Sequence, residues 1–421
     1  MSSAPAAVHQ QRDIVIAGGG MVGVSLALLL AEALPPAARI TLVERFPFPA
    51  AGATAAHPSF DARSTALSYS SRLLFERSGL WPALTERACA IDTIHVSRRG
   101  RFGSAVLAAA EHGWPALGYV VENSWLGHGL AEALHRQGRV EVVSPAQVSR
   151  VEAAGAGCAV HLQQGDEAHC LQASLLVVAD GADSALRESL GMTSRDKPYG
   201  QQALIANVAF AEPHRGCAFE RFTGSGPLAL LPLVAAAGSA HRSALVWALP
   251  PERAEALQAA PEADFIAELQ QAFGYRLGRF LRAGERHTYP LALRQSSEQV
   301  RQGVVVMGNA AHTLHPVAGQ GFNLALRDAA RLAQVLAAAE DGRYGELALL
   351  QRYLRAQQAD QRRTIGASDL LPALFMHPDP LLGLGRDLAL SGLDVAPRLK
   401  REFVRYAAGV AALNTREEAA P

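Results

Sequence analysis

The first part of the chain contains the feature that most constrains its fold: a strand, a glycine-rich turn and a helix in immediate succession. Residues 13–17 (DIVIA) are an apolar run typical of a buried strand, and Gly18, Gly20 and Gly23 follow in a GxGxxG pattern. Apolar residues then recur with helical spacing up to Pro35. In this setting the first glycine permits a tight turn, the second lets a pyrophosphate approach the backbone, and the third lets the helix pack on the strand. The stretch predicts a dinucleotide-binding unit.

A second strand supports the same interpretation. Residues 39–43 (RITLV) end at Glu44, in the place where such units bind the ribose of an adenosine. A carboxylate there can accept both ribose hydroxyls and repels a 2′-phosphate, so we expect FAD or NAD rather than NADP.

Composition narrows the class of protein. The chain has 421 residues, 49% hydrophobic and 19% charged, which fits a globular protein of two or three domains. Its formal net charge is +0, so nothing indicates a nucleic-acid partner. Cys89, Cys158, Cys170 and Cys217 lack the spacing of a zinc site or a disulfide framework, which favours a reducing cytoplasm. The N-terminal residues do not resemble a signal peptide, and no apolar run reaches the ~18 residues of a membrane-spanning helix.

A second glycine-rich loop lies between residues 304 and 328. It follows an apolar strand, GVVVM, and precedes a helical pattern that we expect to begin at Asn323. Its turn-forming and polar residues include Gly308, Asn309, Pro316, Gly319 and Gly321. A loop of about a dozen residues inside a compact domain is usually functional. A helix N-terminus after such a loop suits a phosphate or a developing anion.

Between the two loops the pattern changes twice. Residues 91–121 and 201–293 alternate as antiparallel strands do, with one helix at 262–273, whereas residues 124–143 and 172–187 return to helices and buried strands. We therefore expect an α/β fold, with a Rossmann-like domain in three segments, an inserted and mainly antiparallel substrate domain, and a C-terminal helical region. The predicted boundaries are 12–80, 122–198 and 297–343 for the first, 81–121 and 199–296 for the second, and 344–421 for the third.

Motifs spread along the chain resemble one family. GGGMVG with Glu44, ADGADSALR and GNAAHTLHPVAGQGFNLALRD are similar to motifs of the single-component, FAD-dependent aromatic hydroxylases of the p-hydroxybenzoate hydroxylase type. HPSFDARSTALS, IHVSRRGRFG, CAFERFTGSGPLALLPL and YPLAL resemble the 2-octaprenyl-6-methoxyphenol hydroxylases, a branch that acts in ubiquinone biosynthesis. The wider superfamily has Asp where this chain has Asn309, and the ubiquinone branch has Asn.

The resemblance implies a set of FAD-binding residues. The glycines of the first motif would hold the pyrophosphate, Glu44 the ribose, and backbone groups of Val148 the adenine. The helix after the second loop would point at the pyrimidine ring of the flavin, where its dipole and the preceding N–H groups stabilise the anionic reduced form. The full set is Gly18, Gly20, Gly23, Glu44, Arg45, Arg63, Val148, Asp180, Gly181, Arg187, Gly308, Asn309, Pro316, Gly319, Gly321, Phe322 and Asn323.

The resemblance also implies a reaction. NAD(P)H would reduce the flavin in a transient encounter, because the chain has no second nucleotide fingerprint. O2 would then give a flavin C4a-hydroperoxide, which hydroxylates the ring of a polyprenylated phenol in a cavity closed to water. Phe222, Leu228, Leu230 and Tyr289 are candidates for the lining of that cavity, and each also fits a place in the core. His287, His312, His315 and Tyr289 are candidates for a base by residue type alone.

Several alternatives stay open at this point. The chain could hydroxylate another position of the ubiquinone ring, reduce an isoprenoid chain, or serve as a flavin-bearing scaffold among other ubiquinone-biosynthesis proteins. The apolar C-terminal residues either pack on the body of the protein, cover a tunnel for the prenyl tail, or contact the inner face of a membrane. These residues are Leu370, Leu371, Leu374, Phe375, Leu381, Leu382 and Leu384.

Overall fold

A parallel sheet forms one half of the protein. The computed structural model describes residues 9–52, 57–59, 61, 63–101, 103–236, 238–316, 319–376, 392 and 396–412. Its eight-stranded sheet has the order β18–β19–β11–β1–β2–β8, with β10 beside β11 and β9 beside β10. The parallel strands are β1 (His9–Ala17), β2 (Ile40–Val43), β8 (Val140–Val143), β11 (Glu167–Val178) and β19 (Val304–Val306). The antiparallel strands are β9 (Gln147–Ala154), β10 (Gly157–Gln164) and β18 (Val300–Arg301).

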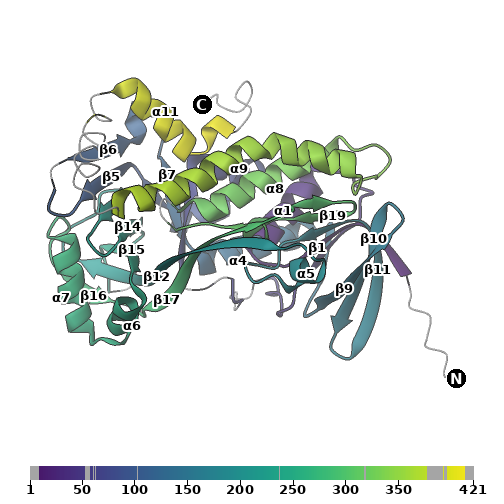
Figure 1. Cartoon of the computed structure of the whole chain (residues 1–421), viewed down its shortest axis with the longest axis horizontal. Helices are drawn as coiled ribbons and strands as arrows, with labels where there is room; N and C mark the ends of the chain where they lie inside the picture. Colours follow the sequence, from purple (N-terminus) through teal and green to yellow (C-terminus); the bar gives the residue numbers. More distant parts are fainter. Residues whose placement is uncertain are drawn as a thin grey trace.

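Both faces of this sheet are covered, which is why its strands are apolar throughout. Ile14, Leu42 and Leu175 point to a layer of helices, whereas Val15 and Leu176 point to the β9–β10 hairpin on the other side. The helices are α1 (Met21–Ala33), α4 (Asn123–Gln137), α8 (Gln320–Ala337) and α9 (Leu347–Met376), and the short α5 (Ala185–Ser189) lies on the hairpin side. Figure 1 shows α8 and α9 running side by side along the sheet.

A nine-stranded, mainly antiparallel sheet forms the other half, in the order β20–β17–β12–β15–β14–β13–β5–β6 with β16 beside β12. Two helices, α6 (Pro251–Ala259) and α7 (Glu262–Phe273), cover one of its faces. Its strands are β5 (Thr93–Arg98), β6 (Ser104–Ala108), β12 (Ser194–Phe210), β13 (Cys217–Phe222), β14 (Pro227–Leu233), β15 (Arg242–Leu249), β16 (Phe280–Ala283), β17 (His287–Ser296) and β20 (His312–Thr313).

A small third sheet connects the two halves. It has the order β3–β7–β4, and the chain passes from β3 to β4 through two short helices, of which α2 packs near α8. These elements are β3 (Ser64–Ser68), β4 (Cys89–Ile91), β7 (Gly118–Glu122), α2 (Tyr69–Arg77) and α3 (Trp81–Leu84).

The α/β fold class is confirmed, and local details differ from expectation. Residues 148–161, whose alternating pattern indicates one strand, form parts of two strands, because the chain reverses at Gly155. The helix α6 was not predicted; it begins at Pro251, and a proline is well tolerated at the first helical position. The helix α8 begins at Gln320 instead of Asn323. The division into domains by residue number stays a prediction.

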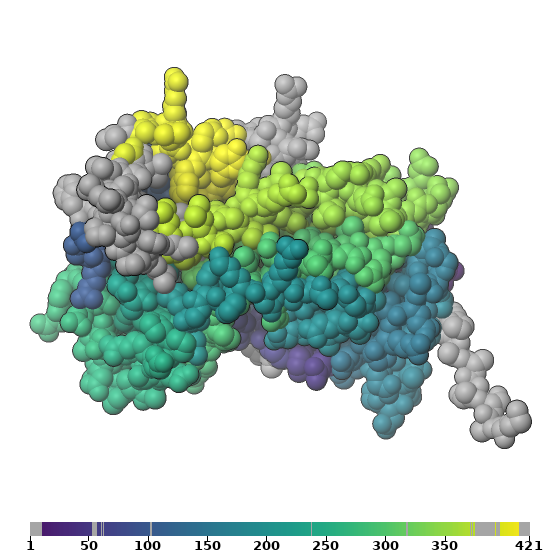
Figure 2. All heavy atoms as spheres, viewed as in Figure 1, coloured from purple at the N-terminus to yellow at the C-terminus, as the bar shows by residue number. Residues whose placement is uncertain are grey.

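The C-terminal part is partly described. After α9, the chain is described again in α11 (Pro397–Ala407), which lies at the surface beside α9 (Figure 2). Among the residues with a described placement, no helix has both the length and the hydropathy to cross a membrane. The predicted contacts of Leu381, Leu382 and Leu384 lie outside the described residues.

Gly23 offers a direct test of how α1 is seated. A Cβ atom at this position would fall on the carbonyl oxygen of Gly18, so Gly23→Ala forces α1 away from β1. We expect a loss of roughly 1–3 kcal/mol in the free energy of unfolding, measured by urea denaturation. Gly366→Ala in α9 is the matched control, because a Cβ there meets nothing within 4 Å and helical Ala is favoured over Gly by about 1 kcal/mol. Equal urea concentrations at the unfolding midpoint for the two variants would contradict this packing.

Candidate functional site

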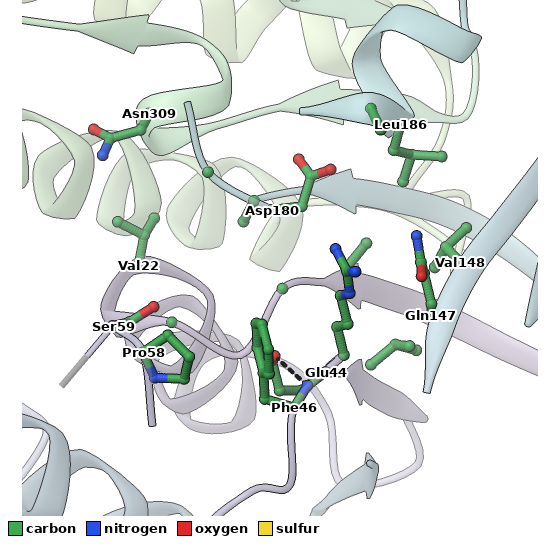
Figure 3. A pocket seen from close by; sticks show the side chains of 18 of the residues that line it. Val22, Glu44, Phe46, Pro58, Ser59, Gln147, Val148, Asp180, Leu186 and Asn309 are labelled. Carbon is green, nitrogen blue, oxygen red and sulfur yellow. Dashed lines mark hydrogen bonds between the residues drawn. The ribbon is translucent and has the colours of Figure 1, made fainter. Parts of the chain in front are cut away.

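A pocket lies at the carboxyl ends of the parallel strands, where open α/β sheets bind their ligands. It has a volume of about 620 Å³ and is lined from the β1–α1 turn, the end of β2, the start of β9, the end of β11 and the first turn of α8. Figure 3 shows Asn309 and Val22 at one end, Gln147 and Val148 at the other, and Asp180 and Glu44 on opposite walls between them. This elongated arrangement suits an extended ligand such as a dinucleotide.

The glycine turn provides the floor of this pocket. Gly18 has a φ of +114°, and a Cβ there would collide with the carbonyl of Ala179, directly after β11, so only glycine fits between the two strand ends. A Cβ on Gly20 would stand 3.0 Å from Oγ of Ser59. Gly20 is also the N-cap of α1 and provides no side-chain cap, so the first N–H groups of the helix are available to an anion. The turn therefore fits a diphosphate.

Glu44 provides a fixed negative charge on the pocket wall. Its Oε2 accepts the backbone N–H of Gly19 at 2.5 Å, and its Oε1 accepts the N–H of Phe46 at 2.8 Å. Burial by itself raises the pKa of this carboxyl, but hydrogen bonds from the His57 side chain and from the two backbone groups outweigh it. The pKa of Glu44 therefore lies below its ordinary value, and the group is ionised at neutral pH.

The pocket brings together many of the predicted residues. Asp180 lies opposite Glu44, and burial raises the pKa of this carboxyl although Ser184 hydrogen-bonds to it. Arg63 connects the pocket to the antiparallel half, since its guanidinium carbon lies 5.1 Å above the ring of Tyr289. The predicted residues that line the pocket are Gly18, Gly20, Glu44, Arg45, Arg63, Val148, Asp180, Gly181, Asn309 and Phe322.

Other predicted residues lie outside this pocket. Gly23 packs α1 on β1, and a Cβ on Gly308 would contact Val22 at 3.2 Å. Arg187 is buried and donates from Nη1 to the carbonyl of Ala310 at 3.0 Å, so it braces the turn η3 (Gly308–Ala310) from behind. Three more, Pro316, Gly319 and Gly321, belong to the loop before α8 and its first turn and are also not among the lining residues.

Asn323 has a structural role that the sequence did not indicate. Its Oδ1 accepts the N–H of Ser68 at 2.8 Å and the hydroxyl of Ser71 at 2.7 Å. Its Nδ2 donates to the carbonyls of Ala66 and Gly319, both at 2.8 Å. The amide of Asn323 is thus satisfied by the protein, so it holds the N-terminus of α8 on the β3–α2 corner instead of reaching into the pocket.

The candidates for the substrate cavity separate into two groups. Leu228 and Leu230 are 0% exposed and pack in the core beneath α6 and α7, which corrects their interpretation as cavity residues. Phe222 is buried on the opposite face of the same sheet, and Tyr289 lies beneath Arg63, which lines the pocket, without being a lining residue itself. Side chains alternate along a strand, and this placement could not be decided without knowing which face the helices cover.

The candidates for a base have unlike surroundings. His287 is exposed, and His312 is buried with its Nε2 2.8 Å from Oδ2 of Asp328. His315 is 1% exposed, and burial lowers its pKa to about 4. An imidazole with that pKa is a poor base for a phenol. The catalytic base is therefore not assigned to any of these histidines.

Sequence reasoning missed three consecutive lining residues, His57, Pro58 and Ser59, together with Phe46 and Gln147. The first three lie in a loop without periodicity, and only the HPSFDARSTALS resemblance drew attention to it. Their contact with the glycine turn arises from the fold and not from any local pattern.

Comparison with known proteins identifies the class. The family described as FAD binding domain matches residues 11–366. The chain therefore belongs to this family, and it is an FAD-dependent monooxygenase. The pocket fits the cofactor, since it combines a bare backbone cradle at Gly18 and Gly20 with an ionised carboxylate at Glu44. The resemblance to aromatic hydroxylases of the p-hydroxybenzoate hydroxylase type is confirmed.

Individual relatives are similar over almost the whole chain. Ubiquinone hydroxylase UbiL of Rhodospirillum rubrum is 34% identical over 399 residues, covering 94% of this chain and 89% of that protein. The 3-demethoxyubiquinol 3-hydroxylase of Escherichia coli is 33% identical over 413 residues, covering 96% and 100%. The solved structure of p-nitrophenol 4-monooxygenase PnpA from Pseudomonas putida DLL-E4 has a TM-score of 0.77 at 18% identity, covering 97% and 100%, and supports the fold.

The buried His315 predicts a pH dependence of stability. Its pKa of about 4 in the folded protein lies below the ordinary value of 6.5, so the unfolded chain takes up the proton first as the pH falls. The free energy of unfolding therefore decreases as the pH falls from 6.5 toward 4, by roughly 2 kcal/mol between pH 7.5 and pH 5. His315→Phe should remove that part of the slope in urea unfolding curves, and the exposed His287→Phe should not. An unchanged slope in the first variant would contradict the assignment.

Proposed function

We propose that this monooxygenase hydroxylates the ring of a polyprenylated, methoxylated phenol in ubiquinone biosynthesis, with NAD(P)H as transient reductant and O2 as co-substrate. The observation that carries the proposal is the match to the Escherichia coli 3-demethoxyubiquinol 3-hydroxylase over all of that protein's length. Relatives named ubiquinone biosynthesis monooxygenase COQ6 add support from animals; the mouse protein is 27% identical over 440 residues, covering 94% of this chain.

The antiparallel half is suited to hold such a substrate. The face of its sheet away from α6 and α7 has alanines in adjacent register, with Ala203 opposite Ala248 and Ala229 opposite Val246. Ile205 and Val246 on the same face are only half-buried. Small side chains beside incompletely covered aliphatic ones provide an apolar surface for a ring and a prenyl tail. We therefore propose that this half binds the phenol while the parallel half binds FAD.

The protein's own groups would bind and orient the reactants. Glu44 anchors the adenosine ribose, the Gly18–Gly20 turn holds the diphosphate, and Asn309 lies toward the flavin end of the pocket. FAD in this pocket, once reduced by NAD(P)H, would activate O2, so that one oxygen atom enters the ring and the other leaves as water. The N-terminal N–H groups of α8 stabilise negative charge on the reduced cofactor, and the two halves of the protein keep water away. Arg63 lies at the boundary between the two halves and connects them, because its guanidinium stacks on the ring of Tyr289.

The C-terminal helix supports contact with a membrane surface. Leu399, Phe403 and Tyr406 recur at helical spacing along α11 and are 68%, 41% and 50% exposed. Arg398 and Arg401 lie beside them and are exposed as well. An exposed apolar stripe flanked by arginines is the pattern of a helix that lies on an anionic lipid surface. Such docking would bring the enzyme to a prenylated substrate, and other ubiquinone-biosynthesis proteins would be neighbours there.

Isotope incorporation tests the proposed reaction. We expect the purified holoenzyme to consume NAD(P)H faster in the presence of a prenylated methoxyphenol, and mass spectrometry to find one ¹⁸O atom from ¹⁸O2 in the product. A product that gains two hydrogens without oxygen would indicate a reductase of isoprenoid chains. Reductant consumption that yields only hydrogen peroxide, or no turnover at all, would favour the scaffold alternative.

Vesicle flotation tests the membrane contact. We expect the protein to float with phosphatidylglycerol vesicles and much less with phosphatidylcholine vesicles, since the arginines attract anionic lipid by about 1 kcal/mol each. Phe403→Ser and Leu399→Ser should each reduce flotation severalfold, because both remove apolar area from the stripe. Leu347→Ser, at the exposed start of α9, is the control and should float normally. If none of the three substitutions changes flotation, α11 is excluded as the membrane contact.

A further inference from the structure

His57 makes two contacts that fix the state of its ring. Its side chain is 2% exposed, and Nδ1 accepts the backbone N–H of Ser59 at 3.2 Å. A neutral imidazole with an accepting Nδ1 carries its proton on Nε2, which lies 3.3 Å from Oε1 of Glu44. Phe46 supports the ring edge-on, with centroids 6.0 Å apart at 87°. The ring is therefore oriented with its donor toward the carboxylate that we assign to the adenosine ribose.

This contact limits what Glu44 can still accept. A carboxylate has about four acceptor positions, two on each oxygen. Oε1 receives the Phe46 N–H and faces His57, and Oε2 receives the Gly19 N–H. One position on Oε2 is left for a ribose hydroxyl. We therefore expect Glu44 to accept one ribose hydroxyl, at Oε2, rather than both, and the contact between His57 and Oε1 to set the direction of that bond.

The same histidine also holds the loop that covers the glycine turn. Pro58 and Ser59 follow it directly and line the pocket beside Val22 at the start of α1 (Figure 3). Ser59 lies so close to Gly20 that a Cβ on that glycine would stand 3.0 Å from the hydroxyl oxygen. Because the Ser59 N–H is bonded to His57, the position of this loop over the diphosphate turn depends on the ring.

We propose that His57 is a positioning residue for the adenosine half of FAD, which turns Oε2 of Glu44 toward the ribose and holds Pro58 and Ser59 over the diphosphate. No local sequence motif indicates this role, because His57 and Glu44 lie on opposite sides of a loop in the sequence and come into contact only in the folded protein. The inference rests on FAD binding and is independent of which phenol the enzyme hydroxylates.

Cofactor affinity of the apoprotein, titrated by fluorescence without any phenol, tests the proposal. His57→Phe keeps the ring against Phe46 and removes both nitrogens, so the Kd for FAD should rise about tenfold. His57→Gln can still donate to Glu44 and should stay within about threefold of the parent, whereas the shorter His57→Asn cannot reach and should behave like the Phe variant. His135→Phe is the matched control, because His135 also lies edge-on to a phenylalanine, Phe48, and bonds one carbonyl, outside the pocket.

A second ligand separates the adenosine half from the flavin half. ADP contains the ribose and the diphosphate but no flavin, so its competition with FAD should weaken by the same factor in His57→Phe. The proposal is overturned if the Phe and parent proteins bind FAD equally, if Gln is as weak as Asn, or if FAD weakens while ADP does not. Should His57→Phe not fold, the comparison of Gln with Asn decides alone. None of these outcomes depends on hydroxylation, so failure here leaves the proposed reaction untouched, and failure of hydroxylation leaves the Kd comparison valid.

Discussion

Close packing of α1 against the carboxyl end of β1 is the contact on which the FAD pocket depends. Gly23 lies against the carbonyl of Gly18, and any larger residue would separate helix and strand. The helix N-terminus consequently stands directly over the strand end, where its free N–H groups can meet a diphosphate. The neighbouring strands β2 and β11 end at the same edge and bring Glu44 and Asp180 to opposite walls. A single backbone contact thus sets the geometry of most of the site.

A second support holds the start of α8, which follows the glycine-rich loop. Asn323 fastens the start of α8 to the β3–α2 corner with three hydrogen bonds, and a fourth joins it to Gly319 at the N-cap of α8. Further along α8, Arg327 pairs with Asp360 at 2.7 Å, and Asp328 lies 2.8 Å from His312. Buried charges of this kind contribute little net stability, because desolvation offsets their attraction. Their effect here is geometric: they fix α8 relative to α9 and to β20, so the glycine-rich loop is carried by rigid elements.

The two halves of the protein differ in the surface that each leaves uncovered for a ligand. The parallel sheet is covered on both faces and presents only its strand ends to a ligand. The antiparallel sheet is covered by α6 and α7 on one face, and the other carries alanines and half-buried aliphatic residues. The stacking of Arg63 on Tyr289 is one of the contacts that join the two, and it lies where a cofactor and a substrate would have to meet.

The sequence by itself determined the fold class and the strand–turn–helix order around Gly18 and Gly308, and its resemblance to a known family implied ten of the residues that line the pocket. The fold class and the order of elements follow from hydrophobic periodicity and glycine placement, which are local properties of the chain. Only the tertiary structure decided that Leu228 and Leu230 are core, that the amide of Asn323 is satisfied within the protein, and that His57 faces Glu44. The physical reason is distance along the chain: Asn323 bonds Ser68 across 255 residues, and a side chain's partners at that separation exist only once the sheets have closed.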